Sequence, residues 1–195
     1  MEEINQPRGS WFTKNRRVVY ENGYGLRVVH DEVLRPNKSE GIYDYLKVKS
    51  GAYTLPLDSN GNVYLVEQFR YPANILSIEV ASGAIESGET SLDAGKRELK
   101  EELGIVANQW INLSRRDDPA PHIMDSTQQL FLAMDLTFEE REYDETEKQN
   151  LRTVKMNFEE AVQAVRESRI SETPSKLAIM LAKDYLENPD LYLVC

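Results

Sequence analysis

Short apolar runs separated by turn residues fill the first half of the chain and predict β-strands. The expected strands cover residues 18–20, 26–30, 43–47, 52–57, 62–69 and 76–80. The pairs Asn22-Gly23 and Asn60-Gly61 lie between neighbouring runs, and an Asn-Gly pair in that position is a strong signal for a β-hairpin. The chain is therefore expected to begin with β-hairpins.

Three later segments show helical spacing of their apolar residues, namely residues 91–103, 157–169 and about 174–187. Asn157 suits the N-cap of the second helix, and Thr173-Pro174 suits the start of the third. Residues 130–136 and 151–156 have the composition of further strands. The order of strands, one helix, strands and two helices predicts an α+β fold or a sandwiched sheet.

Composition and charge narrow the class of protein. Apolar residues make up 41% of the 195 positions, which is enough for one domain with a real core. The formal net charge of -10 disfavours nonspecific binding to nucleic acid. An anionic small substrate is still possible, but local cations would have to attract it.

The sequence shows no expected membrane span, no expected secretion signal and no pair of cysteines. No apolar run approaches the roughly 18 residues that span a bilayer, and residues 1–10 contain no apolar segment of a secretion signal. Cys195 is the only cysteine, so no disulfide can form within the chain. We expect a cytoplasmic protein that has no membrane partner.

The strongest chemical signal is the segment GAIESGETSLDAGKRELKEELGI, residues 83–105. At 100° per residue, Glu101 lies about 60° from Glu98 around the helix and Glu102 about 40° from it on the other side. The three carboxylates therefore share one face, opposite Leu99 and Leu103. Such a face is either a solvated helix surface or a site for a divalent cation, and oxygen ligands favour Mg²⁺ or Mn²⁺ over zinc.

The flanking residues distinguish these two interpretations. At average residue usage, nine specified positions of this kind arise by chance on the order of once in 10⁹ sites. The segment resembles the signature of the Nudix family, G-x5-E-x7-R-E-U-x-E-E-x-G-U, and it matches every position. The resemblance implies an α/β/α sandwich with a mixed sheet over residues 47–195, preceded by an antiparallel β arm over residues 1–46.

The resemblance also implies a role for each residue of the signature. Glu98 and Glu102 would be the main ligands of Mg²⁺, or of Mn²⁺ in its place, with Glu101 as an additional or water-bridged ligand. The carbonyl oxygen of Ser82 would be a backbone ligand. The structural residues would be Gly83 and Gly104, which permit tight turns, and Arg97 paired with Glu89.

Residues outside the signature resemble the ADP-ribose pyrophosphatase and nucleoside diphosphate sugar hydrolase branch. Gln68, Arg70 and Glu79 match residues that precede the signature in that branch, and Arg70 would bind a phosphate or contact a partner subunit's substrate. An ordinary surface ion pair is the alternative for Arg70. Downstream, Pro119 lies near a proline that the branch associates with ADP-ribose-type substrates.

Other positions depart from the branch. Val80-Ala81-Ser82 replaces its usual lead-in to the signature. His122 stands where glycine is usual, and Ser126 where glutamate is usual, which leaves the sugar open. His122 is either a residue that contacts the substrate or a simple loop residue.

The acidic segment 138–148 is where this branch has a catalytic or metal-binding glutamate. Alignment of the strand and helix that follow it puts Glu147 at the position of the catalytic base, with Glu145 as the alternative. Gln149 falls where some members have a second glutamate. Glu101 would assist in catalysis as well as in metal binding.

The resemblance gives the N-terminal strands a role in assembly. In this branch such an arm often forms a homodimer and stacks aromatic side chains on the nucleotide base. Trp11, Tyr43 and Tyr45 are the candidates, with Tyr45 as the predicted substrate-binding residue, although aromatic residues in strands also pack in cores.

We therefore expect a Mg²⁺-dependent pyrophosphatase that hydrolyses ADP-ribose or a related nucleoside diphosphate sugar to a nucleoside monophosphate and a sugar phosphate. A GDP-mannose-type hydrolase is the first alternative, and a hydrolase of nucleoside triphosphates or dinucleotide polyphosphates is less favoured. A Nudix-fold regulator without turnover is a third hypothesis. The complete set of Glu98, Glu101 and Glu102 argues against it, because a pure binding module need not keep a metal site.

Overall fold

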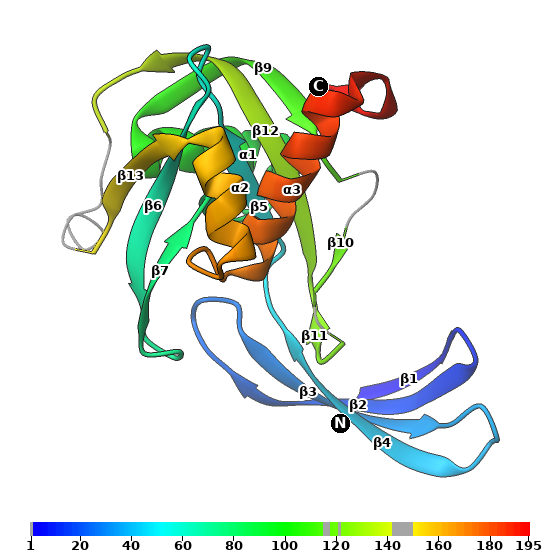
Figure 1. The fold of residues 1–195 in the computed structure, drawn as a ribbon. Coiled ribbons are helices and arrows are strands. Elements are labelled where there is room, and N and C mark those ends of the chain that lie inside the picture. Colours follow the sequence, from blue (N-terminus) through cyan, green and yellow to red (C-terminus); the bar gives the residue numbers. More distant parts are fainter. Residues whose placement is uncertain (1, 115–117, 121, 142–149) are drawn as a thin grey trace. The chain divides into compact units, whose positions relative to one another are not determined.

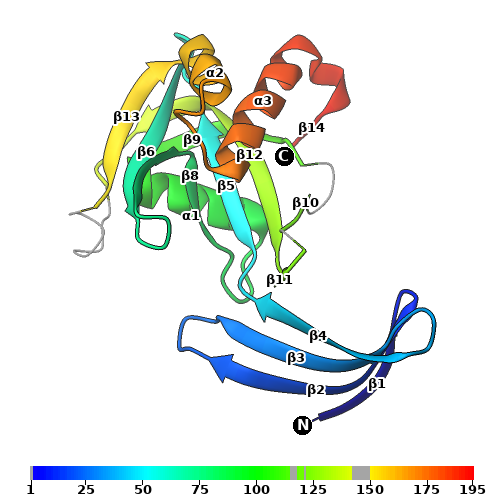
Figure 2. The same ribbon diagram turned by 60° about the horizontal axis from the view of Figure 1, so that its bottom comes forward.

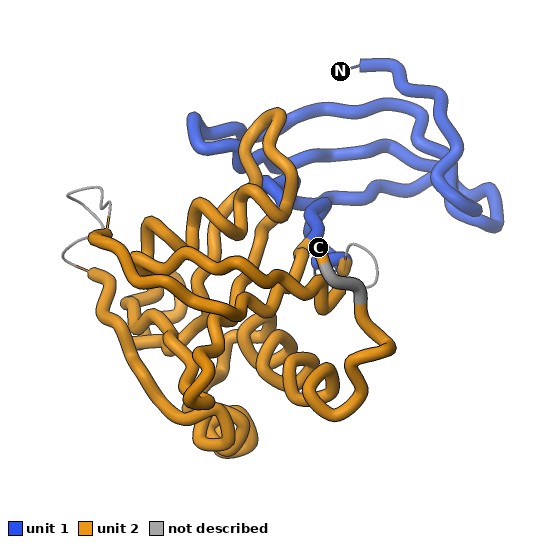
Figure 3. Tube along the Cα trace, turned by 90° about the horizontal axis from the view of Figure 1, so that it is seen from above, with its two compact units in different colours: residues 1–50, 119–127 blue, residues 51–118, 128–195 orange. Residues whose placement is uncertain are grey.

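The computed structural model describes residues 2–114, 118–120, 122–141 and 150–195 (Figure 1). The chain forms two compact units (Figure 3). Unit 1 comprises residues 1–50 and 119–127, and unit 2 comprises residues 51–118 and 128–195. The arm expected over residues 1–46 thus falls within the first segment of unit 1, and residues 119–127 join it from later in the chain.

Unit 1 is a sheet with the strand order β1-β2-β3-β4-β11 (Figure 2). Its strands are β1 (Glu2–Arg8), β2 (Trp11–Glu21), β3 (Arg27–Leu34), β4 (Glu40–Lys47) and β11 (Met124–Asp125). The first four pair antiparallel, and β11 pairs parallel to β4. In β3, Val29, Asp31 and Val33 alternate with more exposed residues, so one face of this sheet is the buried one.

Unit 2 contains two sheets. The larger one has the order β14-β9-β12-β5-β8, with β10 paired to β12, and the smaller one has the order β13-β6-β7. The bounds of the strands are β5 (Gly51–Pro56), β6 (Asn62–Arg70), β7 (Ile75–Glu79), β8 (Ala81–Ala84), β9 (Ile105–Asn112), β10 (Asp118–Pro119), β12 (Thr127–Phe138), β13 (Arg152–Asn157) and β14 (Leu193–Val194).

The helices of unit 2 are α1 (Ser91–Leu103), α2 (Phe158–Arg166) and α3 (Thr173–Glu187), followed by the short 3-10 helix η1 (Pro189–Leu191). The limits expected for the first helix are confirmed, as is the Asn157 N-cap of α2, whose side chain accepts a hydrogen bond from the Glu159 amide. The second helix is shorter than the expected 157–169. Ser168 adopts a φ of 60°, and the Arg169 amide turns back to the Ala164 carbonyl, which ends the helix.

The larger sheet is buried on both faces. In β12, Leu130 and Leu132 contribute to one core cluster, together with Ile179 of α3. Phe131 and Ala133 point the other way, into a second cluster that includes Ala94 and Leu99 of α1. Because side chains alternate between the faces of a strand, α1 covers one face of the sheet and α2 and α3 cover the other, as Figures 1 and 2 show.

Strand β9 was not predicted. Asn108 and Gln109 in its middle are exposed and interrupt the apolar pattern, so the segment lacks the alternation that marks a half-buried strand. Among the described residues, no helix combines the length and the apolar character needed to span a bilayer.

Candidate active site

Helix α1 carries the acidic residues, and its two ends fix their position. The Thr90 side chain caps the first turn by accepting a hydrogen bond from the Asp93 amide at 3.1 Å. Gly104 ends the helix with a φ of 64°, and a Cβ at that position would lie 2.6 Å from the Glu139 carbonyl oxygen. Only glycine satisfies both demands, so the register of the glutamates is set at both ends.

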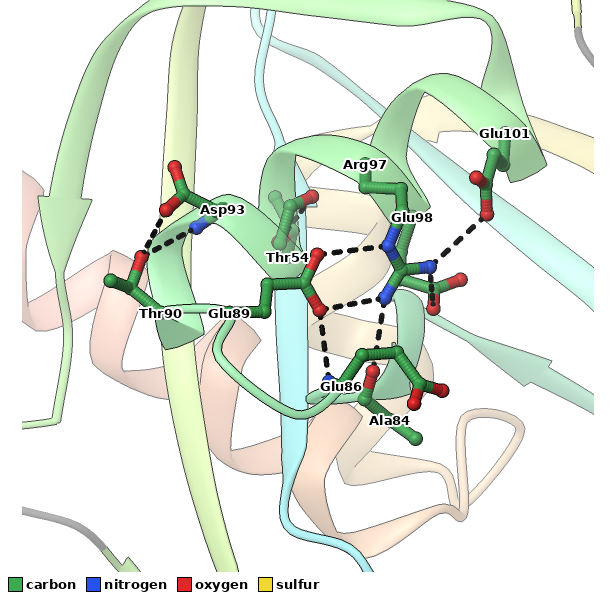
Figure 4. A network of polar contacts seen from close by, with 10 residues as sticks. Thr54, Ala84, Glu86, Glu89, Thr90, Asp93, Arg97, Glu98 and Glu101 are labelled. Atoms are coloured by element: carbon green, nitrogen blue, oxygen red, sulfur yellow. Dashed lines mark hydrogen bonds and ion pairs between the residues drawn. The ribbon is translucent and has the colours of Figure 1, made fainter. Parts of the chain in front are cut away.

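Arg97 lies at the centre of a network of ion pairs (Figure 4). Its Nε donates to Glu89 Oε1 at 2.9 Å, which is the pair expected from the sequence. One terminal nitrogen donates to Glu98 Oε1 at 2.6 Å and to Glu101 Oε2 at 3.2 Å. The other donates to the Ala84 carbonyl at 3.0 Å and to Glu89 at 3.1 Å. The guanidinium therefore joins the loop before α1 to two of the three glutamates.

The same contacts shift two pKa values in opposite directions. The hydrogen bond to Glu89, together with the charge of Glu98, raises the pKa of Arg97 further above its ordinary value. In return, the hydrogen bond from Arg97 lowers the pKa of Glu89 below its ordinary value. Both effects favour the charged forms of Arg97 and Glu89.

Gly83 forms a cradle for the Glu98 carboxylate. A Cβ built at this position of β8 would lie 1.9 Å from Glu98 Oε1, a distance that no real contact allows. Only 15% of the Glu98 side chain is exposed. Glycine is therefore needed at position 83 because the carboxylate packs directly against the backbone of β8.

Glu102 is held by the neighbouring backbone amide. It is buried, and its Oε2 accepts a hydrogen bond from the Ser82 amide at 2.8 Å. Glu101 is the most exposed of the three, with 38% of its side chain accessible. The structure thus brings Glu98 and Glu102 against Ser82 and Gly83 of β8, while Glu101 contacts Arg97.

The donor chemistry of this group fits a hard divalent cation. Carboxylate and carbonyl oxygens are the ligands that Mg²⁺ and Mn²⁺ prefer, and the Gly83 cradle lets Glu98 approach the backbone that carries the Ser82 carbonyl. Within the described part of the chain, no three His, Cys, Asp or Glu side chains already converge on one point as metal ligands would. Glu98 and Glu101 instead share Arg97.

Arg70 contacts a buried carboxylate beside this group. Its Nε donates to Glu79 Oε1 at 2.9 Å, and Gln68 donates to Glu79 Oε2 at 3.2 Å. The Glu79 side chain is only 1% exposed, whereas 44% of the Arg70 side chain is accessible. The hydrogen bond to Glu79 raises the pKa of Arg70, and the charge of Glu102 adds to the effect. Arg70 therefore neutralises a buried acid and also presents a cation near Glu102.

Two further residues near Arg70 were missed by the sequence analysis. Glu172 caps α3, and Ser175 is completely buried in its first turn. Burial raises the pKa of Glu172 above its ordinary value. Only the Thr173-Pro174 helix start was visible in the sequence, and the partner of Ser175, the Val80 amide, lies 95 residues away. No local pattern reveals a contact of that range.

Unit 1 contains a cavity of about 340 Å³. It brings together the predicted residues Tyr45 and His122, and it is also lined by Arg8, Trp11, Thr13, Asp31, Val33, Tyr43, Met124 and Asp125. The Trp11 and Tyr43 rings are 5.8 Å apart and nearly perpendicular. The Arg8 guanidinium lies 5.5 Å from the centre of the Tyr45 ring.

Asp31 gives this cavity a buried carboxylate. It is 2% exposed and accepts two hydrogen bonds from Arg16, both at 2.7 Å. The pair is therefore satisfied and holds its wall of the cavity rigid. Of the other predicted residues, Glu147, Glu145 and Gln149 lie outside the residues that the structure describes.

Comparison with known proteins gives one family. A model of the NUDIX domain matches residues 47–176. ADP-ribose pyrophosphatase from Bacillus subtilis (strain 168) is 26% identical over 151 residues, which cover 76% of this chain and 80% of that protein. ADP compounds hydrolase NudE from Escherichia coli (strain K12) is 25% identical over 170 residues, with coverage of 87% and 83%.

A third relative is named as an activator of another enzyme and not as a hydrolase. Methanol dehydrogenase activator from Bacillus methanolicus is 24% identical over 160 residues, which cover 81% of this chain and 85% of that protein. Among solved structures, the crystal structure of an ADP compounds hydrolase superposes with a TM-score of 0.79 at 20% identity, covering 94% of this chain and 98% of that one. The expected α+β sandwich is thus confirmed at the level of the fold.

Because Gly83 packs directly against the Glu98 carboxylate, we predict that Gly83→Ala weakens metal binding but leaves the stability of the fold nearly unchanged. The new methyl group would displace the Glu98 carboxylate, which is the end of a flexible side chain and can move at little cost to the fold. We expect the affinity for Mn²⁺, measured by electron paramagnetic resonance, to fall at least about 10-fold, with a nearly unchanged melting temperature. Gly23→Ala, where a Cβ meets nothing within 4 Å, is the control. Equal Mn²⁺ affinity of Gly83→Ala and the parent would refute the cradle.

The lowered pKa of Glu89 predicts a pH-dependent contribution to stability. A carboxylate whose pKa is lower in the folded state stabilises the protein above its unfolded pKa of about 4.3, and this contribution disappears as the pH falls through the folded pKa. Glu89→Gln should therefore lower the free energy of unfolding by about 1–2 kcal/mol at pH 7, and the difference should shrink below pH 4. Urea denaturation at a series of pH values measures it. A difference that stays constant down to pH 3 would contradict the assignment.

Proposed function

The chain belongs to the Nudix hydrolase family, and we propose that it is a pyrophosphatase that hydrolyses ADP-ribose or a related nucleoside diphosphate sugar. The products would be a nucleoside monophosphate and a sugar phosphate. The observation that carries the proposal is the group of Glu98, Glu101 and Glu102 on α1, organised by Arg97 and by the Gly83 cradle. The relatives named for ADP-ribose and ADP compounds support this substrate class.

We propose Mg²⁺, or Mn²⁺ in its place, as the cofactor. Glu98, Glu102 and the Ser82 carbonyl would be its main ligands, with Glu101 as an additional one. When bound, such a cation neutralises the diphosphate and lowers the pKa of a bound water. Arg97 would align these ligands by donating to Glu98 and Glu101.

The remaining residues would bind and orient the substrate. The partly exposed Arg70, held by Glu79, can donate to a phosphate oxygen while its Nε stays on the carboxylate. Glu147 remains the proposed catalytic base, with Glu145 as the alternative, because a carboxylate in reach of the attacking water can accept its proton. Precise placement of these groups supplies most of the acceleration in phosphoryl transfer.

We propose that the cavity of unit 1 takes the nucleoside base. Its aromatic wall of Trp11, Tyr43 and Tyr45 can stack on a planar ring, and His122 lies in the same lining. That the protein forms a homodimer and is located in the cytoplasm are also predictions.

A GDP-mannose-type hydrolase is the alternative among enzymes. The chain's similarity to a methanol dehydrogenase activator keeps a regulatory role as the alternative among binding proteins. The intact acids of α1 favour turnover over binding alone. Measuring turnover of a panel of substrates distinguishes the proposed pyrophosphatase from the GDP-mannose-type hydrolase and from the regulator.

The proposed reaction predicts release of a nucleoside monophosphate from ADP-ribose in the presence of Mg²⁺. ADP-ribose, GDP-mannose, UDP-glucose and dinucleotide polyphosphates form the test panel, with products separated by chromatography. Glu102→Gln keeps an acceptor for the Ser82 amide, so it should fold and yet lose more than about 100-fold in kcat/KM, since even partners outside the ligand shell cost 10–100-fold. Activity of this variant within a few-fold of the parent would exclude Glu102 as a ligand. No release from any diphosphate sugar would defeat the proposal.

A further inference from the structure

The chain changes sheets at Val80. Strand β7 ends at Glu79 in the three-stranded sheet, and β8 begins at Ala81 in the larger sheet. Val80 is completely buried between them, and its amide hydrogen needs a partner because a buried unpaired N–H is costly. That partner is the Ser175 side chain, whose Oγ accepts the hydrogen bond at 3.0 Å.

Glu172 fixes the orientation of the Ser175 hydroxyl. The hydroxyl donates to Glu172 Oε2 at 2.6 Å, and the Ser175 amide donates to the same oxygen at 2.7 Å. With its single hydrogen directed at Glu172, the hydroxyl can only accept from Val80. Ser175 is thus held in the one orientation that serves the sheet crossing.

The groups that face Glu172 come from three strands. Tyr53 of β5, Arg70 of β6 and Glu79 of β7 all interact electrostatically with its carboxyl group. The N-terminus of α3 is therefore part of the same polar cluster that contains the Arg70–Glu79 pair. This places Ser175 beside the candidate active site and not in an isolated part of the core.

The segment that follows Val80 carries the site. The Ser82 amide donates to Glu102 at 2.8 Å, and Gly83 packs against the Glu98 carboxylate. Residues 80–83 are consequently held by α3 at one end and by α1 at the other. A displacement at Val80 moves the Ser82 carbonyl relative to both glutamates.

We infer that Ser175, oriented by Glu172, is a positioning residue that holds residues 80–83 where the Ser82 carbonyl, Glu98 and Glu102 can bind one divalent cation. The inference rests on the proposed function for its effect on turnover. Its effect on metal binding can be measured without substrate. Ser175 itself touches no reacting group.

The chain contains a matched control for this arrangement. Ser114 is also buried, and its Oγ accepts from the Leu130 amide at 3.1 Å and donates to Asp118 at 2.8 Å. It therefore makes the same two contacts as Ser175, a backbone amide and a carboxylate, at a place that does not adjoin residues 80–83. Ser114→Ala removes the same chemistry and should leave metal binding unchanged.

The test compares Ser175→Ala, Ser114→Ala and the parent in the full-length protein. We expect Ser175→Ala to bind Mn²⁺ at least about 10-fold more weakly by electron paramagnetic resonance, as loss of a positioning contact typically does. Hydrogen exchange of the amides of residues 80–83 should be faster in this variant. Its kcat should fall more than its KM changes. Ser114→Ala should match the parent in all three measurements.

A second pair of variants covers the case in which Ser175→Ala does not fold. Glu172→Ala removes the acceptor that orients the hydroxyl, and Glu172→Gln retains one. We expect Glu172→Ala to weaken Mn²⁺ binding and Glu172→Gln to stay near the parent.

Unchanged Mn²⁺ affinity and unchanged hydrogen exchange in Ser175→Ala would overturn the inference. So would a loss of Mn²⁺ affinity in Ser114→Ala equal to that in Ser175→Ala, or an equal loss in both Glu172 variants. A parent protein that binds no Mn²⁺ would also overturn it. The proposed function fails separately, if the parent binds Mn²⁺ but releases no monophosphate from any diphosphate sugar.

Discussion

The single positive charge of Arg97 offsets part of the negative charge of Glu89, Glu98 and Glu101, and the rest of the site depends on these contacts. At roughly 6 Å and an effective dielectric constant near 20, each pair of like charges costs on the order of 3 kcal/mol. Arg97 offsets this by donating to Glu89, Glu98 and Glu101 at once. Because Glu89 precedes α1 and the other two lie on it, the same cation ties the loop to the helix.

Unit 2 supports this charged group on a helix that packs against a sheet buried on both faces. Strands β5 and β12 send alternate side chains into two cores, so α1 is held on one face and α3 on the other. Gly83 brings β8 into contact with Glu98, and Ser175 of α3 satisfies the amide where the chain crosses from β7 to β8. Helices on opposite faces thereby hold the same short segment.

Local spacing made part of this predictable. Helical spacing indicated the limits of α1 and the shared face of the glutamates, because these depend on residues within a few turns of one helix. The resemblance to the family signature implied the Arg97–Glu89 pair. The contact between Ser175 and Val80, and the shared cavity of Tyr45 and His122, join distant parts of the chain and leave no periodic pattern. Strand β9 was missed because exposed Asn108 and Gln109 interrupt its apolar residues. The arrangement of long-range polar contacts therefore required the structure.

The central claim is that Glu98, Glu102 and the Ser82 carbonyl hold a divalent cation against the face of α1. The most direct measurement is an anomalous difference map from crystals of the protein soaked in Mn²⁺. The account predicts a peak bounded by these three groups, at distances typical of metal–oxygen bonds of about 2.0–2.3 Å. A Mn²⁺ peak held by other residues, with Glu98 still bound to Arg97, would contradict it.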